Sequence, residues 1–120
     1  MANILIVDDS NTYAQAHAMM LEKLGHSITF AENGEKAIEM ATANKPDLIL
    51  MDLIMPGMNG FQATRKLSKA PETSSIPIII TSSKDQETDI IYGQRQGAVV
   101  YLVKPVEENA LIEAVNKALG

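Results

Sequence analysis

Charged side chains stand directly after three apolar runs of this sequence. Asp8 and Asp9 follow the first run, Asp52 follows the second, and Lys104 follows the third. Carboxylates that are held close together repel one another unless a hard cation lies among them. With a fixed lysine charge beside them, these residues predict a site for a metal ion and a phosphoryl group.

Alternating strands and helices must position these residues. Short aliphatic runs predict strands over residues 3–7, 27–31, 47–51, 76–80 and 99–103, and apolar residues at helical spacing predict helices over residues 12–24, 34–42, 61–67, 87–95 and 107–119. This alternation predicts a (βα)5 α/β fold, with one doubly wound, five-stranded parallel sheet and helices on both faces. Ligands bind such sheets beyond the carboxyl ends of the strands. There we expect Asp8, Asp9, Asp52, Ser82 and Lys104 to meet.

The first predicted helix, residues 12–24, has recognisable end signals. Ser10 or Asn11 is a natural N-cap, and Gly25 favours a stop. Residues at helical spacing predict its apolar face: Ala16, Met19, Met20, Leu21 and Leu24. His17 is expected to be exposed. Five methionines are expected to fill the core rather than form a binding surface: Met19, Met20, Met51, Met55 and Met58.

Length and composition exclude several classes of protein. The 120 residues predict a single domain over residues 1–120, without an output domain. A formal net charge of −5 and scattered cations argue against nucleic-acid binding. The chain has no cysteine, and His17 and His26 are not at ligand spacing, so neither a disulfide nor a zinc site is expected. No run approaches the roughly 20 apolar residues that span a bilayer, and no signal peptide is recognisable, which predicts a cytoplasmic protein.

Mg²⁺ is the cation that best fits the predicted site, because it prefers octahedral oxygen ligands and keeps several waters. We expect Asp9 and Asp52 to bind it directly and Asp8 to act through water. An Asp52 oxygen beside the metal can attack a phosphoryl group and form an acyl phosphate, so Asp52 is the predicted nucleophile. Lys104 would place positive charge on the phosphoryl oxygens, and the Ser82 hydroxyl would hydrogen-bond to them.

Taken singly, each of these residues has a plainer explanation. Asp8 and Asp9 could cap a helix, Asp52 could belong to a turn with Pro56 and Gly60, and Lys104 could be a surface lysine. Their shared position at one edge of one predicted sheet favours the functional interpretation.

The sequence resembles the receiver domain of the CheY-like response regulators over essentially its whole length. The matching segments are Ile4-Leu5-Ile6-Val7-Asp8-Asp9-Ser10, then Asp52-Leu53-Ile54-Met55-Pro56-Gly57-Met58-Asn59-Gly60, then Ser82, and Lys104-Pro105. The spacings also agree: Ser82 lies 82 − 52 = 30 residues after Asp52, and Lys104 lies 104 − 82 = 22 after Ser82. The resemblance implies the flavodoxin-like strand order 2-1-3-4-5.

The resemblance also implies a function. A histidine kinase, for which the CheA-like hybrid type is one candidate, would pass a phosphoryl group to Asp52. The Ile54 backbone carbonyl would be a further metal ligand, and Mn²⁺ could replace Mg²⁺. Ser82 would move toward the phosphoryl group, and Tyr101 would rotate inward. The surface formed by the fourth helix, fifth strand and fifth helix would then change for a phosphorylation-dependent protein target. Such a protein is a phosphoacceptor with weak self-phosphorylation and self-dephosphorylation, not an enzyme.

Some segments point to a subgroup. Three segments resemble a single-domain regulator of type IV pilus twitching motility: Gly60-Phe61-Gln62-Ala63-Thr64-Arg65, Lys84-Asp85-Gln86-Glu87-Thr88-Asp89 and Gln94-Arg95-Gln96-Gly97-Ala98. A monomer is expected, and two roles stay open: effector binding after phosphorylation, or a phosphate sink for a shared kinase. Ile54 and Lys84 depart from the chemotaxis pattern, and both are expected to border the path of an attacking water.

Three other classes of protein compete with the receiver interpretation. A phosphatase of the haloacid dehalogenase type needs a second carboxylate two residues after its nucleophile, where this chain has Ile54. A flavodoxin-like electron carrier needs a phosphate-binding loop after the first strand, where Asp8 and Asp9 stand instead. A scaffold receiver that is never phosphorylated would not need the complete set of site residues.

Overall fold

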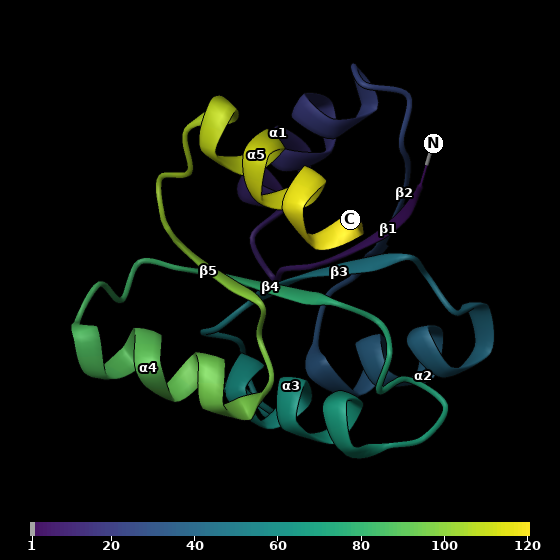
Figure 1. The fold of residues 1–120 in the computed structure, drawn as a ribbon, viewed down its shortest axis with the longest axis vertical. Helices are drawn as coiled ribbons and strands as arrows, with labels where there is room; N and C mark the ends of the chain where they lie inside the picture. Colours follow the sequence, from purple (N-terminus) through teal and green to yellow (C-terminus); the bar gives the residue numbers. More distant parts are fainter. Residues whose placement is uncertain (1) are drawn as a thin grey trace.

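The computed structural model describes residues 2–120 as alternating strands and helices (Figure 1). The strands are β1 (Asn3–Val7), β2 (Ser27–Ala31), β3 (Leu48–Asp52), β4 (Ile78–Ser82) and β5 (Val100–Val103). The helices are α1 (Asn11–Glu22), α2 (Gly34–Asn44), α3 (Gly60–Lys69), α4 (Glu87–Gln96) and α5 (Glu108–Leu119). The predicted alternation of five strands and five helices is confirmed.

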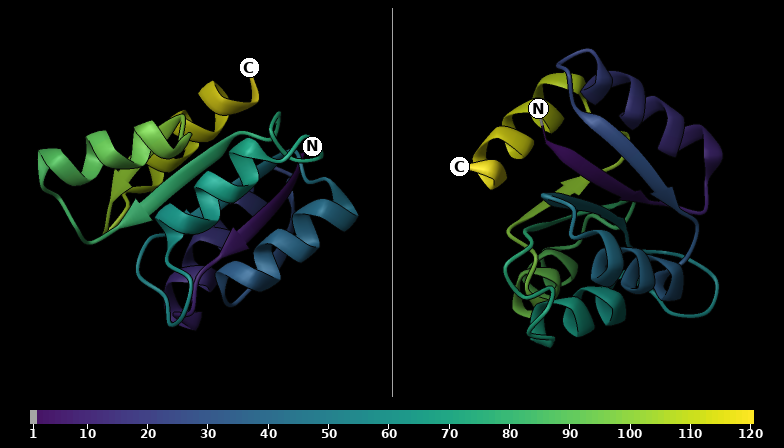
Figure 2. Two further views of the ribbon diagram at one scale, coloured as in Figure 1. Left: turned by 90° about the horizontal axis from the view of Figure 1, so that it is seen from below. Right: turned by 90° about the vertical axis from the view of Figure 1, so that its right-hand side faces the viewer.

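The strands form one parallel sheet in the order β2-β1-β3-β4-β5. Helices α1 and α5 cover one face, and α2, α3 and α4 cover the other (Figures 1 and 2). Both the doubly wound architecture and the predicted strand order are therefore confirmed. The order reverses between β1 and β3, which is where ligands bind in sheets of this kind.

Strand side chains divide between two cores, one on each face of the sheet. In β1, Ile4 and Ile6 belong to the core under α1 and α5, whereas Leu5 and Val7 belong to the core under α2, α3 and α4. All residues of β3 and β4 are buried. Burial on both faces explains why these strands read as continuous apolar runs. The polar side chains of β3 and β4 are therefore confined to the carboxyl ends of these strands.

Three predicted strands, β3, β4 and β5, have boundaries that are wrong by one or two residues. Strand β4 begins at Ile78 rather than residue 76, because Ile76 donates its N–H to Thr73 in a turn and Pro77 has no N–H to donate. Strand β3 runs through Asp52, so the carboxylate stands on the last residue of the strand instead of after it. Ser82 likewise ends β4.

Every predicted helix also differs from the observed one by one or two residues at one end or both, as α1 and α2 illustrate. Helix α1 ends at Glu22, and Gly25 supplies the positive φ of 89° in the turn that follows. Helix α2 continues to Asn44, and its C-cap residue Lys45 has a left-handed conformation with φ 49°. Among residues 2–120, no helix combines the length and the apolar character that crossing a bilayer requires.

The buried face of α1 matches the prediction only in part: Leu21 is buried and Met20 packs against the core, but the other predicted residues are not buried. The buried residues of α1 are Ala14, His17, Ala18 and Leu21. His17, predicted to be exposed, is only 2% exposed, because it shares the i, i+3, i+4 face with Ala14 and Leu21. Met19 is instead 65% exposed and Leu24 42% exposed.

The expected core role of the methionines holds only in part. Met51 and Met55 are buried in the core on the α2, α3 and α4 side of the sheet, and Met58 packs against it. Met20 packs against the other core. The prediction is wrong for Met19, which lies on the solvent side of α1.

Candidate functional site

The predicted site residues stand at the carboxyl edge of the sheet. Asp8 and Asp9 directly follow β1, Asp52 ends β3, Ser82 ends β4 and Lys104 directly follows β5. Asp52 pairs in register with Thr81, the residue before Ser82. The Lys104 N–H donates to the Ser82 carbonyl over 2.7 Å. Parallel pairing therefore brings these five positions to one edge, as predicted.

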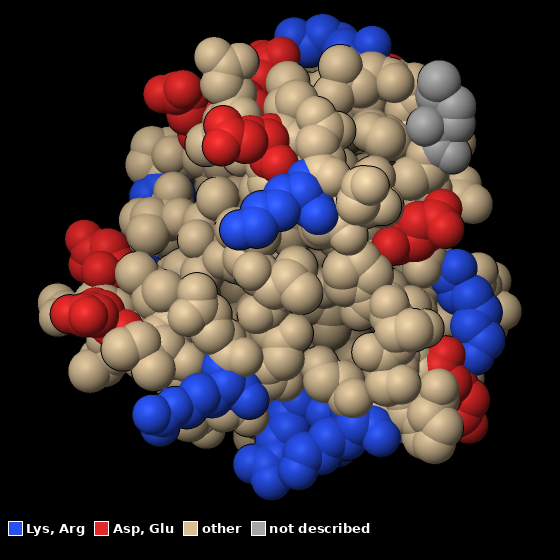
Figure 3. Space-filling view, in the orientation of Figure 1, with Lys and Arg blue, Asp and Glu red and all other residues tan. Residues whose placement is uncertain are grey.

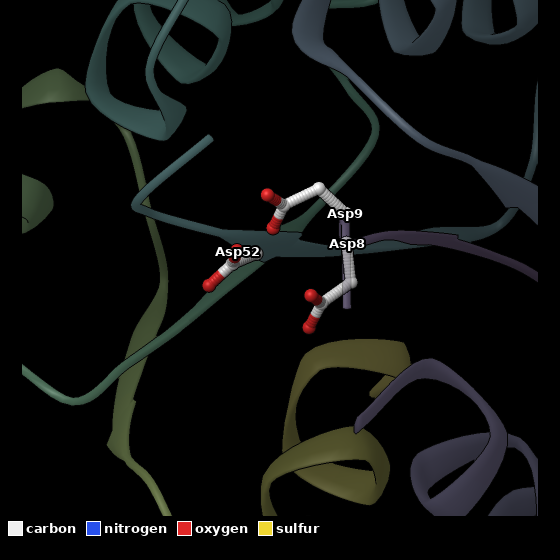
Figure 4. A group of neighbouring side chains, drawn as sticks. All are labelled: Asp8, Asp9 and Asp52. Atoms are coloured by element: carbon white, nitrogen blue, oxygen red, sulfur yellow. The ribbon is translucent and has the colours of Figure 1, made fainter. Parts of the chain in front are cut away.

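Asp8, Asp9 and Asp52 form a compact acidic cluster (Figure 4). One carboxylate oxygen from each residue lies within 4.8 Å of the others. Asp8 and Asp52 are buried, with 6% and 5% of their surface exposed, whereas Asp9 is exposed. The Ser10 N–H donates to Oδ1 of Asp8 over 2.8 Å, which fixes one carboxylate at the start of α1.

Lys104 bridges two members of this acidic cluster. Its Nζ donates to Oδ2 of Asp8 and to Oδ1 of Asp52, each over 2.9 Å. The Tyr13 ring of α1 lies under the same ammonium, with Nζ 4.1 Å from the ring centroid. Two of the three ammonium hydrogens are thus committed to carboxylates, and the ring face offers a further attraction.

Burial and charge together set the protonation of the cluster. Burial raises the pKa of the Asp52 carboxyl to about 6, and the charges of Asp8 and Asp9 add to this, although the Lys104 hydrogen bond opposes it. Burial alone would lower the pKa of the Lys104 ammonium, but its hydrogen bonds to the two carboxylates raise it on balance. Lys104 thus stays a fixed cation.

The donor set fits Mg²⁺. Three convergent carboxylates carry up to three negative charges, and Lys104 is the one cation hydrogen-bonded to them in the described chain. Carboxylate oxygens are the ligands that a hard divalent cation prefers. Ile54, whose carbonyl was predicted as a further ligand, lies two residues beyond Asp52 in the loop before α3. Its role in metal binding stays a prediction.

Gly60 lets the loop after Asp52 turn back tightly. The Gly60 N–H donates to the Leu53 carbonyl over 2.7 Å. A Cβ at this position would collide with the Asp52 carbonyl oxygen and lie 2.7 Å from the Leu53 Cα. A capping box between Asn59 and Gln62 then starts α3. The loop is therefore packed against the backbone that carries the acidic cluster.

Gly60→Ala is expected to destabilise the protein by about 2 kcal/mol, because backbone atoms cannot move aside for the new methyl group. Gly34→Ala is the matched control: the atoms nearest to its Cβ belong to the Met58 side chain, at 3.1 Å, which can move. Urea unfolding of both variants measures the difference. Equal losses of stability would contradict this account of Gly60.

Ser82 and Tyr101 are linked through the backbone of one residue. The Lys84 N–H donates to the Ser82 hydroxyl over 3.1 Å, and the Tyr101 hydroxyl donates to the Lys84 carbonyl over 2.9 Å. Gly93 of α4 leaves room for the ring, since a Cβ there would lie 3.1 Å from it. The predicted switch pair therefore shares a physical connection at Lys84.

Sequence reasoning missed Tyr13, Gly93 and the buried position of His17. Tyr13 lies in the first turn of α1, and its ring packs near the His17 ring, with 6.0 Å between centroids. Burial, followed by the Lys104 charge, lowers the pKa of the His17 imidazole, so His17 adds no second cation to the site. The i, i+4 spacing of Tyr13 and His17 was the sequence signal that the two rings lie on one face of the helix.

Comparison with known proteins decides the family. Residues 4–116 match the family model described as response regulator receiver domain. The chain belongs to this family. Over 120 residues it is 56% identical to the protein PilH of Pseudomonas aeruginosa, covering 100% of this chain and 99% of the relative. The receiver-domain interpretation is therefore confirmed, and the phosphatase and flavodoxin alternatives no longer apply.

Solved receiver structures share the same architecture. A putative response regulator from Chloroflexus aurantiacus superimposes with a TM-score of 0.94 at 30% identity, covering 98% of this chain and 97% of that one. The chemotaxis response regulator CheY4 of Vibrio cholerae has a TM-score of 0.91 at 27% identity, with 98% of both chains covered. The CheY-like fold expected from the sequence is confirmed.

Proposed function

We propose that this receiver domain is a stand-alone response regulator that accepts a phosphoryl group on Asp52 from a histidine kinase. The observation that carries the proposal is the cluster of Asp8, Asp9 and Asp52 with Lys104 bonded to two of them. The proposed nucleophile and metal ligands thus lie within 4.8 Å of one another, and the ammonium lies 2.9 Å from two of them. Phosphoryl transfer needs little more than such positioning and charge stabilisation.

In the proposed reaction, an Asp52 carboxylate oxygen attacks phosphorus and the bond from phosphorus to the kinase histidine nitrogen breaks. The product is an aspartyl phosphate and a free imidazole. Asp9 and Asp52 would hold Mg²⁺ directly, with Asp8 acting through water and the Ile54 carbonyl as a further ligand. The bound metal supplies positive charge to the phosphoryl oxygens, and Mn²⁺ can replace it.

In the proposed reaction, Lys104 and Ser82 stabilise the phosphorylated form of Asp52. Once Asp52 is phosphorylated, the Lys104 ammonium can bond to a phosphoryl oxygen in place of Oδ1. Ser82 is the last residue of β4 at this edge, and its hydroxyl would also hydrogen-bond to a phosphoryl oxygen. A shift of Ser82 would be transmitted through the Lys84 backbone to Tyr101 and so to the surface of α4, β5 and α5.

The likeness to PilH supports a place in type IV pilus twitching motility or in chemotaxis-like signalling. We expect a cytoplasmic, monomeric protein with one domain over residues 1–120, and a CheA-like hybrid kinase is one candidate donor. A gain in affinity for a protein target on phosphorylation would favour the effector role. Rapid turnover without such a gain would favour the phosphate-sink role.

Intact-mass measurement with a small phosphodonor such as acetyl phosphate tests the proposal. With Mg²⁺ present, the mass should rise by one phosphoryl group, and chelation of the metal should prevent the gain. A scaffold receiver would show no gain although it binds Mg²⁺.

Tyr13→Leu is expected to slow phosphorylation about three- to tenfold, because the ring face attracts the Lys104 ammonium by about 1 kcal/mol. Tyr13→Phe keeps the ring and should retain the wild-type rate. Initial rates by mass spectrometry, with urea unfolding as a stability control, measure both. The account of Tyr13 fails if the Leu variant reacts as fast as wild type.

Ile54→Asn and Lys84→Glu are each expected to shorten the life of the aspartyl phosphate several-fold. Ile54 is 52% exposed and Lys84 is also exposed, so both can border the path of an attacking water. Asn would add a hydrogen-bonding partner for that water, and Glu would replace a cation by an anion that can orient it. Dephosphorylation followed by mass after removal of the donor measures the effect; unchanged rates in both variants would contradict it.

A further inference from the structure

Helix α3 carries a basic face that the proposed phosphoryl chemistry does not use. Arg65, Lys66 and Lys69 are exposed on this ten-residue helix, which contains no acidic residue. Within residues 2–120, none of the three forms an ion pair with a carboxylate. Figure 3 shows blue side chains gathered along the lower edge, over α3 and α4. The positive charge of α3 is opposite in sign to the net charge of the whole chain, which is −5.

A groove of about 770 Å³ lies beside the basic face. Its lining residues are Glu35, Gly57, Met58, Gln62, Arg65, Lys66, Lys69 and Ala70. Three cations thus share one groove with the half-buried side chains of Met58 and Ala70. Glu35 is the one carboxylate in the lining. A ligand that fits this groove needs several negative charges and some apolar surface.

A second hollow, of about 340 Å³, lies on the α4 side of the same helix and shares Gln62 and Arg65 with the groove. Phe61 and Tyr92 meet there edge to face, with ring centroids 4.7 Å apart. Tyr92 remains 49% exposed although it is paired. Exposed aromatic and arginine side chains are the residues that most often anchor protein partners. Arg65 therefore stands between two hollows that both offer apolar contacts.

Helix stability explains only part of this arrangement. Lys66 and Lys69 lie in the last turn of α3, where cations interact favourably with the helix dipole. Arg65 lies outside that turn, and the dipole does not account for the groove or for the exposed aromatic pair. The combination of charge and concavity needs a further explanation.

We propose that the α3 face, formed by Arg65, Lys66 and Lys69 with the hollows on either side, docks an acidic segment of a partner protein. Carboxylates of the segment would pair with the three cations, and its apolar side chains would enter the hollows beside Met58 and Tyr92. Glu35 in the lining would repel the continuous phosphate backbone of a nucleic acid, whereas a protein segment can place an apolar residue beside it. A concave groove suits a protein segment better than the flat surface of a membrane.

The docking face adjoins the loop that follows Asp52. Gly57 and Met58 belong to this loop and also line the groove. The loop ends at Gly60, which is packed against the end of β3. A bound segment would therefore contact the loop between the phosphoacceptor and α3. The inference goes beyond the proposed function and does not depend on phosphorylation of Asp52.

Selection from a displayed library of random peptides tests the docking face. The wild-type protein serves as bait, and a variant with Arg65→Gln, Lys66→Gln and Lys69→Gln serves for counter-selection. Gln has nearly the helix propensity of Lys and Arg, so α3 should persist. A control variant with Lys23→Gln, Lys36→Gln and Lys117→Gln removes the same charge from exposed positions elsewhere.

The enriched peptides should combine Asp or Glu with apolar residues. They should bind the α3 variant at least tenfold more weakly than wild type and bind the control variant as well as wild type. Amide NMR shifts of labelled protein should change over residues 57–70. Three results would each overturn the inference: no enrichment, enrichment of peptides without acidic residues, or equal weakening in the two variants. Binding of anionic vesicles at this face without acidic-peptide binding would assign the face to a membrane instead.

Discussion

The Asp52→Asn variant should take up no phosphoryl group under conditions in which the wild-type protein is fully phosphorylated. An amide cannot form the aspartyl phosphate, because its oxygen is a poor nucleophile and its nitrogen carries no negative charge. Asn is nearly the same size as Asp, so the fold should persist around it. Intact-mass spectrometry with Mg²⁺ and acetyl phosphate measures the uptake. Glu113→Gln, at an exposed position on α5, is the control and should react as wild type.

The same variant should change how stability depends on pH when no metal is present. Burial raises the pKa of the Asp52 carboxyl to about 6, so the folded protein binds this proton more tightly than the unfolded chain does. The contribution of Asp52 to stability is therefore full at low pH and is lost as the pH rises through about 6. Asp52→Asn should remove this loss. Denaturation of both proteins at pH 5 and pH 8, in the presence of a chelator, measures the contrast.

Phosphorylation that persists in Asp52→Asn would mean that another residue is the acceptor. An identical fall of stability with pH in both proteins would mean that Asp52 is not the group that titrates. These two outcomes separate the chemical role of Asp52 from its electrostatic role.

Lys104→Met should have opposite effects on phosphorylation and on metal binding. The phosphorylation rate should fall by about 10² to 10³, which is the usual cost of removing one preorganised group that stabilises charge in the transition state. Mg²⁺ affinity should instead rise by about tenfold or more, because the ammonium no longer competes for the oxygens of Asp8 and Asp52. Rates by mass spectrometry and affinities by calorimetry measure the two effects.

The free energy of unfolding provides a third measurement of the role of Lys104. Without metal, Lys104→Met leaves two buried carboxylates unpaired and should destabilise the protein by about 3 kcal/mol. Added Mg²⁺ should restore most of this loss. Lys117→Met, at an exposed position on α5, should alter none of the three quantities. A parallel fall of rate and metal affinity in Lys104→Met would show that the site had collapsed instead.

The fold and the position of the site could be predicted because both depend on strong, local signals. Short apolar runs predicted all five strands to within two residues. Three of the runs are followed by Asp or Lys, and parallel pairing brings Asp8, Asp52 and Lys104 to one edge. β4 was predicted two residues early because Ile76 and Pro77 extend the apolar run without extending the hydrogen-bonded strand.

The helix faces and the support of the site were harder to predict. Helix α1 has apolar residues on more than one side, so its phase was misassigned, and His17 was placed in solvent although it is buried. The contact of Tyr13 with Lys104 joins α1 to the end of β5 and has no signal in local sequence. The need for Gly60 likewise appears only when α3 is packed against the backbone of Asp52.

The most direct test of the central claim is to locate the phosphoryl group on the chain. Borohydride reduces an aspartyl phosphate to homoserine, and peptide mass spectrometry then identifies the modified residue. After reaction with acetyl phosphate and Mg²⁺, homoserine should be found at position 52, and the chelated sample should contain none. Homoserine at another aspartate, or phosphate on a hydroxyl or imidazole side chain, would contradict the account.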